Sequence, residues 1–206
     1  MPEFEEISGI KIQLPEKPKK KDILFSNLPK KKQKWSRTEM PSGLSPDTAS
    51  KYADFINQEF DRRANGVWFM NNGVPTYITG EHYYYLNWCK LDIGYPDYRD
   101  RDRRFYMFWE HCTKDPDCFG LVMVKHRREG ASYKGAAMLL YEVTANYNAH
   151  GGIISKTGAD AKSLFTDKMV YMFRNLPFFF QPIIDGSDNP KSTLSFNQPG
   201  QKISKN

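Results

Sequence analysis

The pattern of hydrophobic and polar positions predicts a helix that begins near Ser45. Ser45-Pro46-Asp47 is typical of a helix start. Proline fits the first helical turn, because a backbone N–H at that position has no partner within the helix and its absence costs nothing. A stripe at helical spacing follows, formed by Tyr52, Phe55, Ile56, Glu59 and Phe60.

A hairpin and two more helices are predicted next. Residues 67–79 read VWFMNNGVPTYIT, in which two aromatic or β-branched runs flank Asn72-Gly73, a strong hairpin signal. Thr79 is placed to cap a following helix. After a turn at residues 94–96, a helix is expected over roughly 97–114, rich in charge and then in aromatic residues.

The period of the pattern changes at Phe119. Residues 119–124 (FGLVMV) and Ile153-Ile154-Ser155 are short apolar runs of the kind found in buried parallel strands. A helical pattern lies between them, and a capping box at residues 157–160 opens a helix that ends at Pro177. We expect a further strand near Leu194-Ser195-Phe196. This order predicts the first part of a three-layer α/β domain with a parallel sheet.

Charge is concentrated near the N-terminus. Between Lys17 and Arg37 stand nine Lys or Arg and one acid, Asp22, so this segment carries 9 − 1 = +8, against +6 for the chain. Residues 1–45 also hold five prolines and only three aromatics, which predicts a flexible basic arm. The arm is suited to the phosphates of a nucleic acid or to an acidic protein surface, or it is a solvated tail.

Composition excludes several classes of protein. Aromatic residues make up 15% of the chain, enough for a real core. No apolar run is long enough to span a bilayer, and the acidic N-terminus lacks the apolar region of a secretory signal. Three cysteines are too few for a disulfide framework, so we expect a cytoplasmic protein that is neither secreted nor membrane-bound.

Candidate chemistry lies in the loop between the first predicted core strand and the helix after it. Residues 124–134 read VKHRREGASYK. A helix N-terminus behind such a loop favours phosphate, and the usual pattern is G-x-x-x-x-G-K-[ST]. Gly130 and Ser132 fit this pattern, whereas Lys125 replaces the first glycine and Ala131 the lysine. A lysine at the loop's first position can fold back over the same phosphates, and Arg127 and Arg128 add bidentate donors.

These residues resemble the deviant Walker A motif of the large terminase subunit of tailed bacteriophages, some of which carry their lysine at the start of the loop. Similar segments flank the motif, and together they cover roughly residues 50–205; the likeness is greatest to crAss-like and related phages. The quoted segments are YITGEHYYYLN (77–87), YRDRDRR (98–104), GIISK (152–156), AKSLF (161–165), NLP (175–177) and FQP (180–182).

The resemblance implies an incomplete P-loop NTPase of the additional-strand class, which packages double-stranded DNA into a procapsid using ATP and Mg²⁺. It implies that Lys125 contacts the β- and γ-phosphates, that Ser132 binds Mg²⁺ through its hydroxyl, and that Arg127 or Arg128 acts catalytically on the γ-phosphate charge. The full implied ATP-binding set is Lys125, His126, Arg127, Arg128, Glu129, Gly130, Ala131, Ser132, Tyr133, Lys134 and, at the position that reads adenine, Asp102.

Two departures from the family pattern shape the expectation. Asp102 stands where the family often has a glutamine, and a carboxylate accepts from the adenine amino group but donates nothing back. The sequence also ends before a Walker B strand closing in Asp-Glu and before a nuclease half. We therefore expect the N-terminal part of a longer terminase, which alone does not hydrolyse ATP because it lacks a general base.

The predicted organisation has three parts: a flexible basic arm at 1–45, a helix and hairpin lead-in with the adenine-side segment at 46–117, and the first part of the ATPase core at 118–206. The implied partners are double-stranded DNA, a portal protein, a small terminase subunit and further copies in a ring, in the cytoplasm of an infected bacterium. Two alternatives stay open: another P-loop nucleic-acid motor such as a helicase, and a non-catalytic nucleic-acid-binding module.

Overall fold

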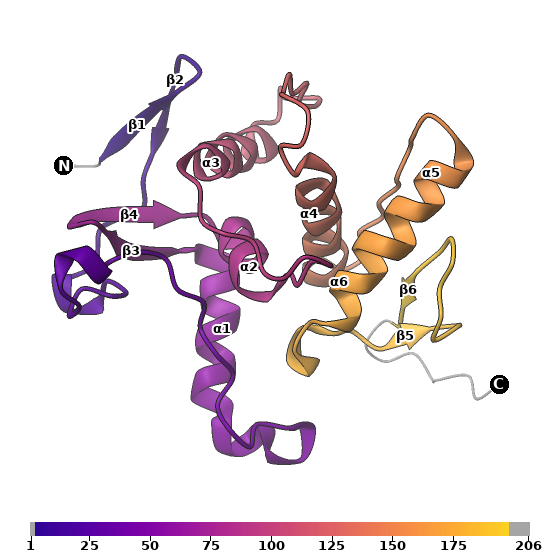
Figure 1. The fold of residues 1–206 in the computed structure, drawn as a ribbon, viewed down its shortest axis with the longest axis horizontal. Coiled ribbons are helices and arrows are strands. Elements are labelled where there is room, and N and C mark those ends of the chain that lie inside the picture. Colours follow the sequence, from indigo (N-terminus) through magenta and orange to yellow (C-terminus); the bar gives the residue numbers. More distant parts are fainter. Residues whose placement is uncertain (1–2, 198–206) are drawn as a thin grey trace.

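The computed structural model describes residues 3–197, and its centre is a helix buried on all sides. All nine residues of α2 (Gly80–Trp88) are buried, including the polar Glu81, His82 and Asn87. Helices α1 (Ala53–Asn65), α3 (Asp100–Lys114) and α4 (Ala131–Ala145) pack around α2, as Figure 1 shows.

The elements from Ser45 to Trp88 form where the sequence predicts them. A 3-10 helix, η3 (Pro46–Tyr52), begins with a capping box between Ser45 and Thr48 and leads into α1. Strands β3 (Val67–Asn71) and β4 (Val74–Ile78) pair antiparallel around Asn72-Gly73, both at positive φ. The Thr79 hydroxyl accepts a hydrogen bond from the His82 amide and caps α2. The predicted hairpin and caps are confirmed.

A buried carboxylate joins α1 to α2. Glu59 of α1 is fully buried, and its Oε2 accepts hydrogen bonds from the Tyr83 hydroxyl at 2.6 Å and from Trp88 Nε1 at 2.9 Å. Its Oε1 accepts from Arg62 at 2.7 Å. Both oxygens are therefore satisfied, which is the condition for burying a carboxylate without a large loss of stability.

The C-terminal part is one helical rod followed by a small hairpin. The rod runs through α5 (Gly158–Ser163), a π-helical stretch η4 (Leu164–Val170) and α6 (Tyr171–Arg174), and η4 packs against α4 (Figure 1, orange). After η5 (Phe178–Phe180), strands β5 (Ile184–Asp185) and β6 (Ser195–Phe196) pair antiparallel, which confirms the strand predicted near Ser195.

The N-terminal segment differs from the predicted flexible arm. It forms strands β1 (Phe4–Ile7) and β2 (Ile10–Gln13) and two short turns of 3-10 helix, η1 (Lys20–Asp22) and η2 (Lys30–Lys32). Between these turns Leu24 exchanges backbone hydrogen bonds with Trp68 and Met70 of β3.

The side chains of this segment explain why it packs. Trp35 makes edge contacts with Phe69 and Tyr83, and Ile23 is buried against Trp68. The few apolar residues scattered among the lysines of residues 1–45 are thus used as anchors, and the described part of this segment belongs to the folded unit.

The two expected core strands are not strands in the structure. Residues 119–124 and 153–155 lie outside regular structure, and Phe119, Val122, Val124 and Ile154 are 92–101% exposed. A strand needs a neighbour to receive its hydrogen bonds. Within residues 3–197 the named strands pair in three two-stranded antiparallel sheets, and the isolated bridges join Leu24 to Phe69 and Leu91 to Gly94. The three-layer parallel P-loop sheet stays a prediction.

Candidate nucleotide-binding site

The loop singled out by the sequence leads directly into the N-terminus of α4. Gly130 is the N-cap of the helix, in the left-handed conformation at φ 71°, and Arg128 is also left-handed at φ 69°. The amides of Tyr133 and Lys134 both donate to the Gly130 carbonyl at 3.0 Å. The first two helical amides, of Ala131 and Ser132, have no backbone acceptor within the part of the chain that is described. Two free N–H groups at the positive end of a helix dipole favour an anion.

The charged side chains of the loop are open to solvent. Lys125, His126, Arg127 and Arg128 are all exposed, and Ser132 is exposed in the first turn of α4. Glu129 is half-buried and accepts a charge-assisted hydrogen bond from Arg101 of α3 at 2.9 Å. The Glu129 carboxylate thereby ties the loop to α3, while the cationic side chains of the loop stay accessible to a ligand.

Two members of the predicted ATP-binding set are paired with each other. The Lys134 ammonium, 6% exposed, lies 2.6 Å from Oδ1 of Asp102, whose side chain is 8% exposed. The Lys134 ammonium also lies over the Phe105 ring at 5.2 Å. This pair fastens the first turn of α4 to α3, so neither group is presented to solvent, and the Asp102 carboxylate is engaged by a cation.

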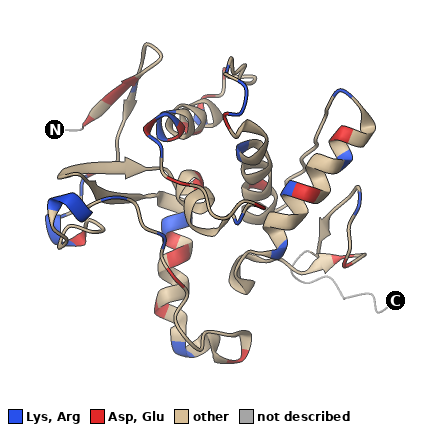
Figure 2. Cartoon of the chain, viewed as in Figure 1, with Lys and Arg blue, Asp and Glu red and all other residues tan. Residues whose placement is uncertain are grey.

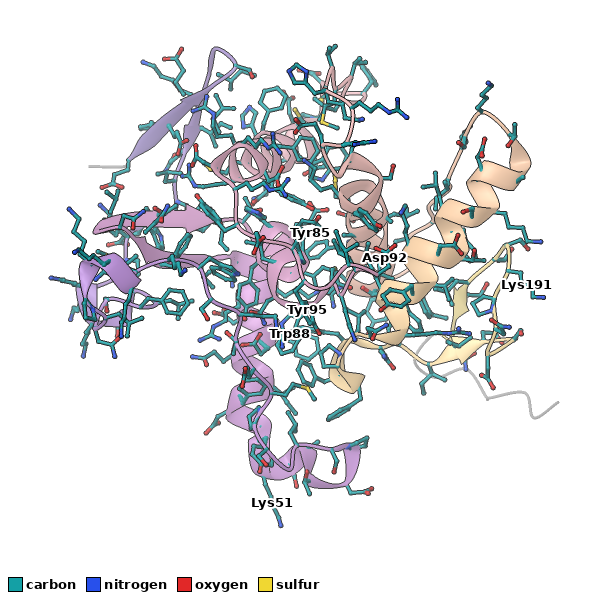
Figure 3. The ribbon with its side chains drawn as sticks, in the orientation of Figure 1. Lys51, Tyr85, Trp88, Asp92, Tyr95 and Lys191 are labelled. Carbon is teal, nitrogen blue, oxygen red and sulfur yellow. The ribbon has the colours of Figure 1, made fainter. Side chains whose placement is uncertain are left out.

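Tyr133 connects the start of α4 to two other parts of the chain. Its hydroxyl donates to Asp92, in the segment after α2, at 2.5 Å, and the Lys168 ammonium of η4 lies 3.7 Å from the centre of its ring. Figure 3 shows Asp92 between α2 and α4, close to this junction. A cation from the π-helical stretch is therefore held beside the third residue of α4.

A hollow lies next to Ser132. It has a volume of about 420 Å³, and its lining includes Ser132, Trp109 of α3 and the exposed Ile154. A larger hollow of about 1160 Å³ lies toward the C-terminal end of α4, and residues of the 125–134 loop take no part in its lining. Space for a ligand thus exists on the loop side of α4, beside apolar residues of the segment expected to be a strand.

Two ionisable groups in the first turn of α2 are buried close together. Burial, with Glu142 and Glu110 adding repulsion, raises the pKa of Glu81 from 4.5 to about 8. Burial, with the positive charges of Arg103 and Lys134, lowers the pKa of His82 from 6.5 to about 3. The His82 ring stacks on Tyr106 with centroids 4.8 Å apart, so it is held as a neutral aromatic ring.

Sequence reasoning found the loop but missed its neighbours. Asp92 and Lys168 lie 41 and 35 residues from Tyr133 along the chain, and their sequence contexts carry no motif. The sequence analysis did single out Asp102, the partner of Lys134, but as the residue that reads adenine. Within residues 3–197, no group of three or more His, Cys, Asp or Glu side chains is arranged to hold a metal ion. Over the same range, no helix has the length and apolarity needed to cross a membrane.

Comparison with known proteins adds no relationship. No protein-family model matches the chain, and neither the curated proteins nor the solved structures that were compared contain a match.

Proposed function

We propose that this chain is the ATP-binding N-terminal part of a DNA-packaging motor similar to the large terminase of tailed phages. One observation carries the proposal: α4 begins at Ala131, directly behind a left-handed Gly130 and a cationic loop that opens with Lys125. The glycine, the exposed hydroxyl two residues later and the free helix N-terminus occupy the places that a phosphate-binding loop requires.

The exposed apolar segments support the same reading. Residues 119–124 lead into the loop and residues 153–155 follow α4, and both carry apolar side chains open to solvent. In a P-loop fold these two positions are occupied by core strands buried on both faces. Phe119, Val122 and Val124 would be covered once such a sheet is complete.

The roles of the loop residues follow from their positions. Lys125 reaches the β- and γ-phosphates, and the amides of Ala131 and Ser132 donate to phosphate oxygens. Ser132 is suited to bind Mg²⁺ because its side chain is exposed at the N-terminus of α4. Arg127 and Arg128 neutralise charge that develops on the γ-phosphate. Lys134 and Asp102, being paired, position α4 against α3 and leave the nucleotide to the exposed residues.

The proposal extends to partners and location. The motor acts on double-stranded DNA, with a portal protein, a small terminase subunit and further copies of itself in a ring, in the cytoplasm of an infected bacterium. Hydrolysis needs a metal-binding aspartate and a general base that the 125–134 loop does not supply. We therefore expect the chain to bind MgATP and to turn it over poorly.

Titration of MgATP into the protein, followed by calorimetry, tests the loop. Lys125→Ala removes a charge-assisted contact worth about 1.5–3 kcal/mol, so the dissociation constant should rise about tenfold to a hundredfold. Lys191→Ala is the matched control, because Lys191 is exposed and lies at the C-terminal hairpin, far from the loop (Figure 3). Binding should also weaken when Mg²⁺ is chelated, and in Ser132→Ala.

Two results would contradict the proposal. Equal affinity of Lys125→Ala and wild type for MgATP would show that the loop is placed wrongly. A wild-type protein that binds DNA but no nucleotide would favour the non-catalytic nucleic-acid-binding module, which the lysine-rich N-terminal segment also supports.

A further inference from the structure

Seven lysines of the N-terminal segment form an exposed surface in which none of them is paired with an acid of the described chain. All seven are exposed, and no salt bridge is recorded for any of them within residues 3–197. We call them the lysine surface: Lys19, Lys20, Lys21, Lys30, Lys31, Lys32 and Lys34. Figure 2 shows blue segments gathered on the short turns beside β3 and β4.

Two neighbouring cations have other roles. Lys17 pairs with Glu3 at 2.5 Å. The Arg37 guanidinium lies 3.9 Å from the centre of the Tyr95 ring and donates to the Asn87 carbonyl at 3.4 Å. The exposed acid within the surface is Asp22, so its net charge is 7 − 1 = +6.

The lysine surface is fixed to the fold. The turn of η1 leads into Ile23, which is buried against Trp68 of β3, and into Leu24, which hydrogen bonds to β3. The turn of η2 is held at the other end of the hairpin, where the Asn72 amide donates to the Gln33 carbonyl at 2.7 Å. The carbon chain of Lys30 also packs over Gly73. The charges are therefore presented on two short turns anchored to one β-hairpin.

The residue types of the lysine surface indicate which kind of polyanion it binds. Lysine is depleted in the cores of protein–protein interfaces, whose anchors are aromatic residues and arginine. Single-stranded nucleic acid is bound by exposed aromatic rings on which bases stack. The nearby rings of Phe25 and Trp35 are instead packed on each other and on Phe69. A surface made of lysines, with neither arginine nor exposed aromatic rings, is suited to bind the phosphates of a duplex. Such phosphate contacts carry no information about the base sequence.

We infer that the lysine surface is a docking site for the phosphate backbone of double-stranded DNA, formed by η1 and η2 on the β3–β4 hairpin. The inference rests on the proposed function in taking duplex DNA as the partner. It goes beyond that function in assigning DNA contact to a place separate from the loop at residues 125–134. Binding at this surface should be independent of sequence, of ATP and of Lys125.

The test measures how the affinity of the full chain for a 30-base-pair duplex of mixed sequence depends on salt, by fluorescence anisotropy. Lys31→Gln with Lys32→Gln removes two charges from η2, and both side chains are exposed. The slope of log K against log salt should fall in magnitude by about 1.8, which corresponds to about sixtyfold weaker binding at 0.1 M salt. Lys51→Gln with Lys191→Gln removes the same charge from places far from the surface and should leave the slope unchanged (Figure 3).

Each other outcome overturns the inference. Equal slopes for the two double variants would show that the charge acts by its total and not by its position. Tighter binding of a single strand than of the duplex, or of poly-glutamate than of either, would assign the surface to another polyanion. A second variant, Lys19→Gln with Lys21→Gln, repeats the test on η1 in case the first one unfolds.

The same samples separate this inference from the proposed function. A protein that binds duplex DNA through the lysine surface but no MgATP would refute the nucleotide proposal and leave the surface standing. A protein that binds MgATP through Lys125, with DNA affinity indifferent to the lysines, would do the reverse.

Discussion

The buried pair at the start of α2 predicts an unusual dependence of stability on pH. Glu81 has a pKa raised from 4.5 to about 8, and His82 has a pKa lowered from 6.5 to about 3. Below pH 4.5 Glu81 is protonated in both the folded and the unfolded state, and its contribution to stability is lost as pH rises toward 8. The contribution of His82 is complete above pH 6.5 and is lost as pH falls toward 3.

Between pH 4.5 and 6.5 the two effects cancel. The unfolded chain there carries a proton on the histidine and none on the glutamate, whereas the folded chain carries one on the glutamate and none on the histidine. The two states bind equal numbers of protons, so the free energy of unfolding should be flat. From pH 6.5 to 8 only Glu81 differs, and stability should fall by about 1.4 kcal/mol per pH unit, or about 2 kcal/mol in all.

The substitution Glu81→Gln separates the two groups. It should abolish the fall above pH 6.5 and expose the unopposed effect of His82, so that the free energy of unfolding rises by about 3 kcal/mol between pH 4.5 and 6.5. Among the described residues, the other groups with a displaced pKa are tyrosines, cysteines and Asp167, which titrate outside this window.

Urea unfolding followed by tryptophan fluorescence, at five pH values from 4.5 to 8, measures these slopes. Glu16→Gln, which neutralises an exposed carboxylate, is the control and should keep the wild-type profile. If Glu81→Gln shows the same fall above pH 6.5 as wild type, the fall arises elsewhere and the reasoning about Glu81 is wrong.

Two further predictions concern buried polar contacts. Glu59→Ala leaves the Tyr83 hydroxyl and Trp88 Nε1 without their acceptor, and should lower the free energy of unfolding by about 3–5 kcal/mol in urea denaturation; a change within about 0.5 kcal/mol would contradict the network. Lys134→Met leaves the Asp102 carboxylate buried and unpaired, and should destabilise by about 3–5 kcal/mol in the same assay. Adding Asp102→Leu should restore most of that loss, whereas a double variant no more stable than Lys134→Met would show that the two groups are not coupled.

Local signals in the sequence predicted much of the fold between Ser45 and Trp88. The Asn72-Gly73 turn, the Thr79 cap and the proline at the start of η3 each act within a few residues, so their effect is visible without tertiary context. The helix before Pro177 and the strand at Ser195 were predicted in the same way.

Features that depend on distant partners could not be predicted. Asp102 and Arg103 belong to a charge run with the pattern of a solvated helix face, yet both are buried. Their partners are Lys134 and Glu5, which lie 32 and 98 residues away along the chain. A charged side chain is buried when a countercharge arrives with it, and the spacing of charges along one helix does not reveal that.

The predictions for the N-terminal segment and for the two strands differ from the structure in opposite ways: the first segment is more ordered than predicted, and the two strands are less ordered. Proline and lysine content predicted a flexible arm, but Leu24 and Trp35 suffice to pack it on β3. Apolar runs predicted strands at 119–124 and 153–155, but a strand needs a neighbour, and in the described part of the chain these two segments lie outside regular structure with apolar side chains exposed.

The complete burial of α2 has a consequence for how its backbone exchanges hydrogen with solvent. A helix with an exposed face can fray and exchange its amides through small local openings. Each side of α2 is covered by a different part of the chain, drawn from α1, α3, α4 and η5, so its inner amides reach water only when several of these separate together. Exchange of the Tyr84 to Trp88 amides should therefore report the stability of the whole domain, and would show directly whether ligands at the loop or at the lysine surface stabilise it.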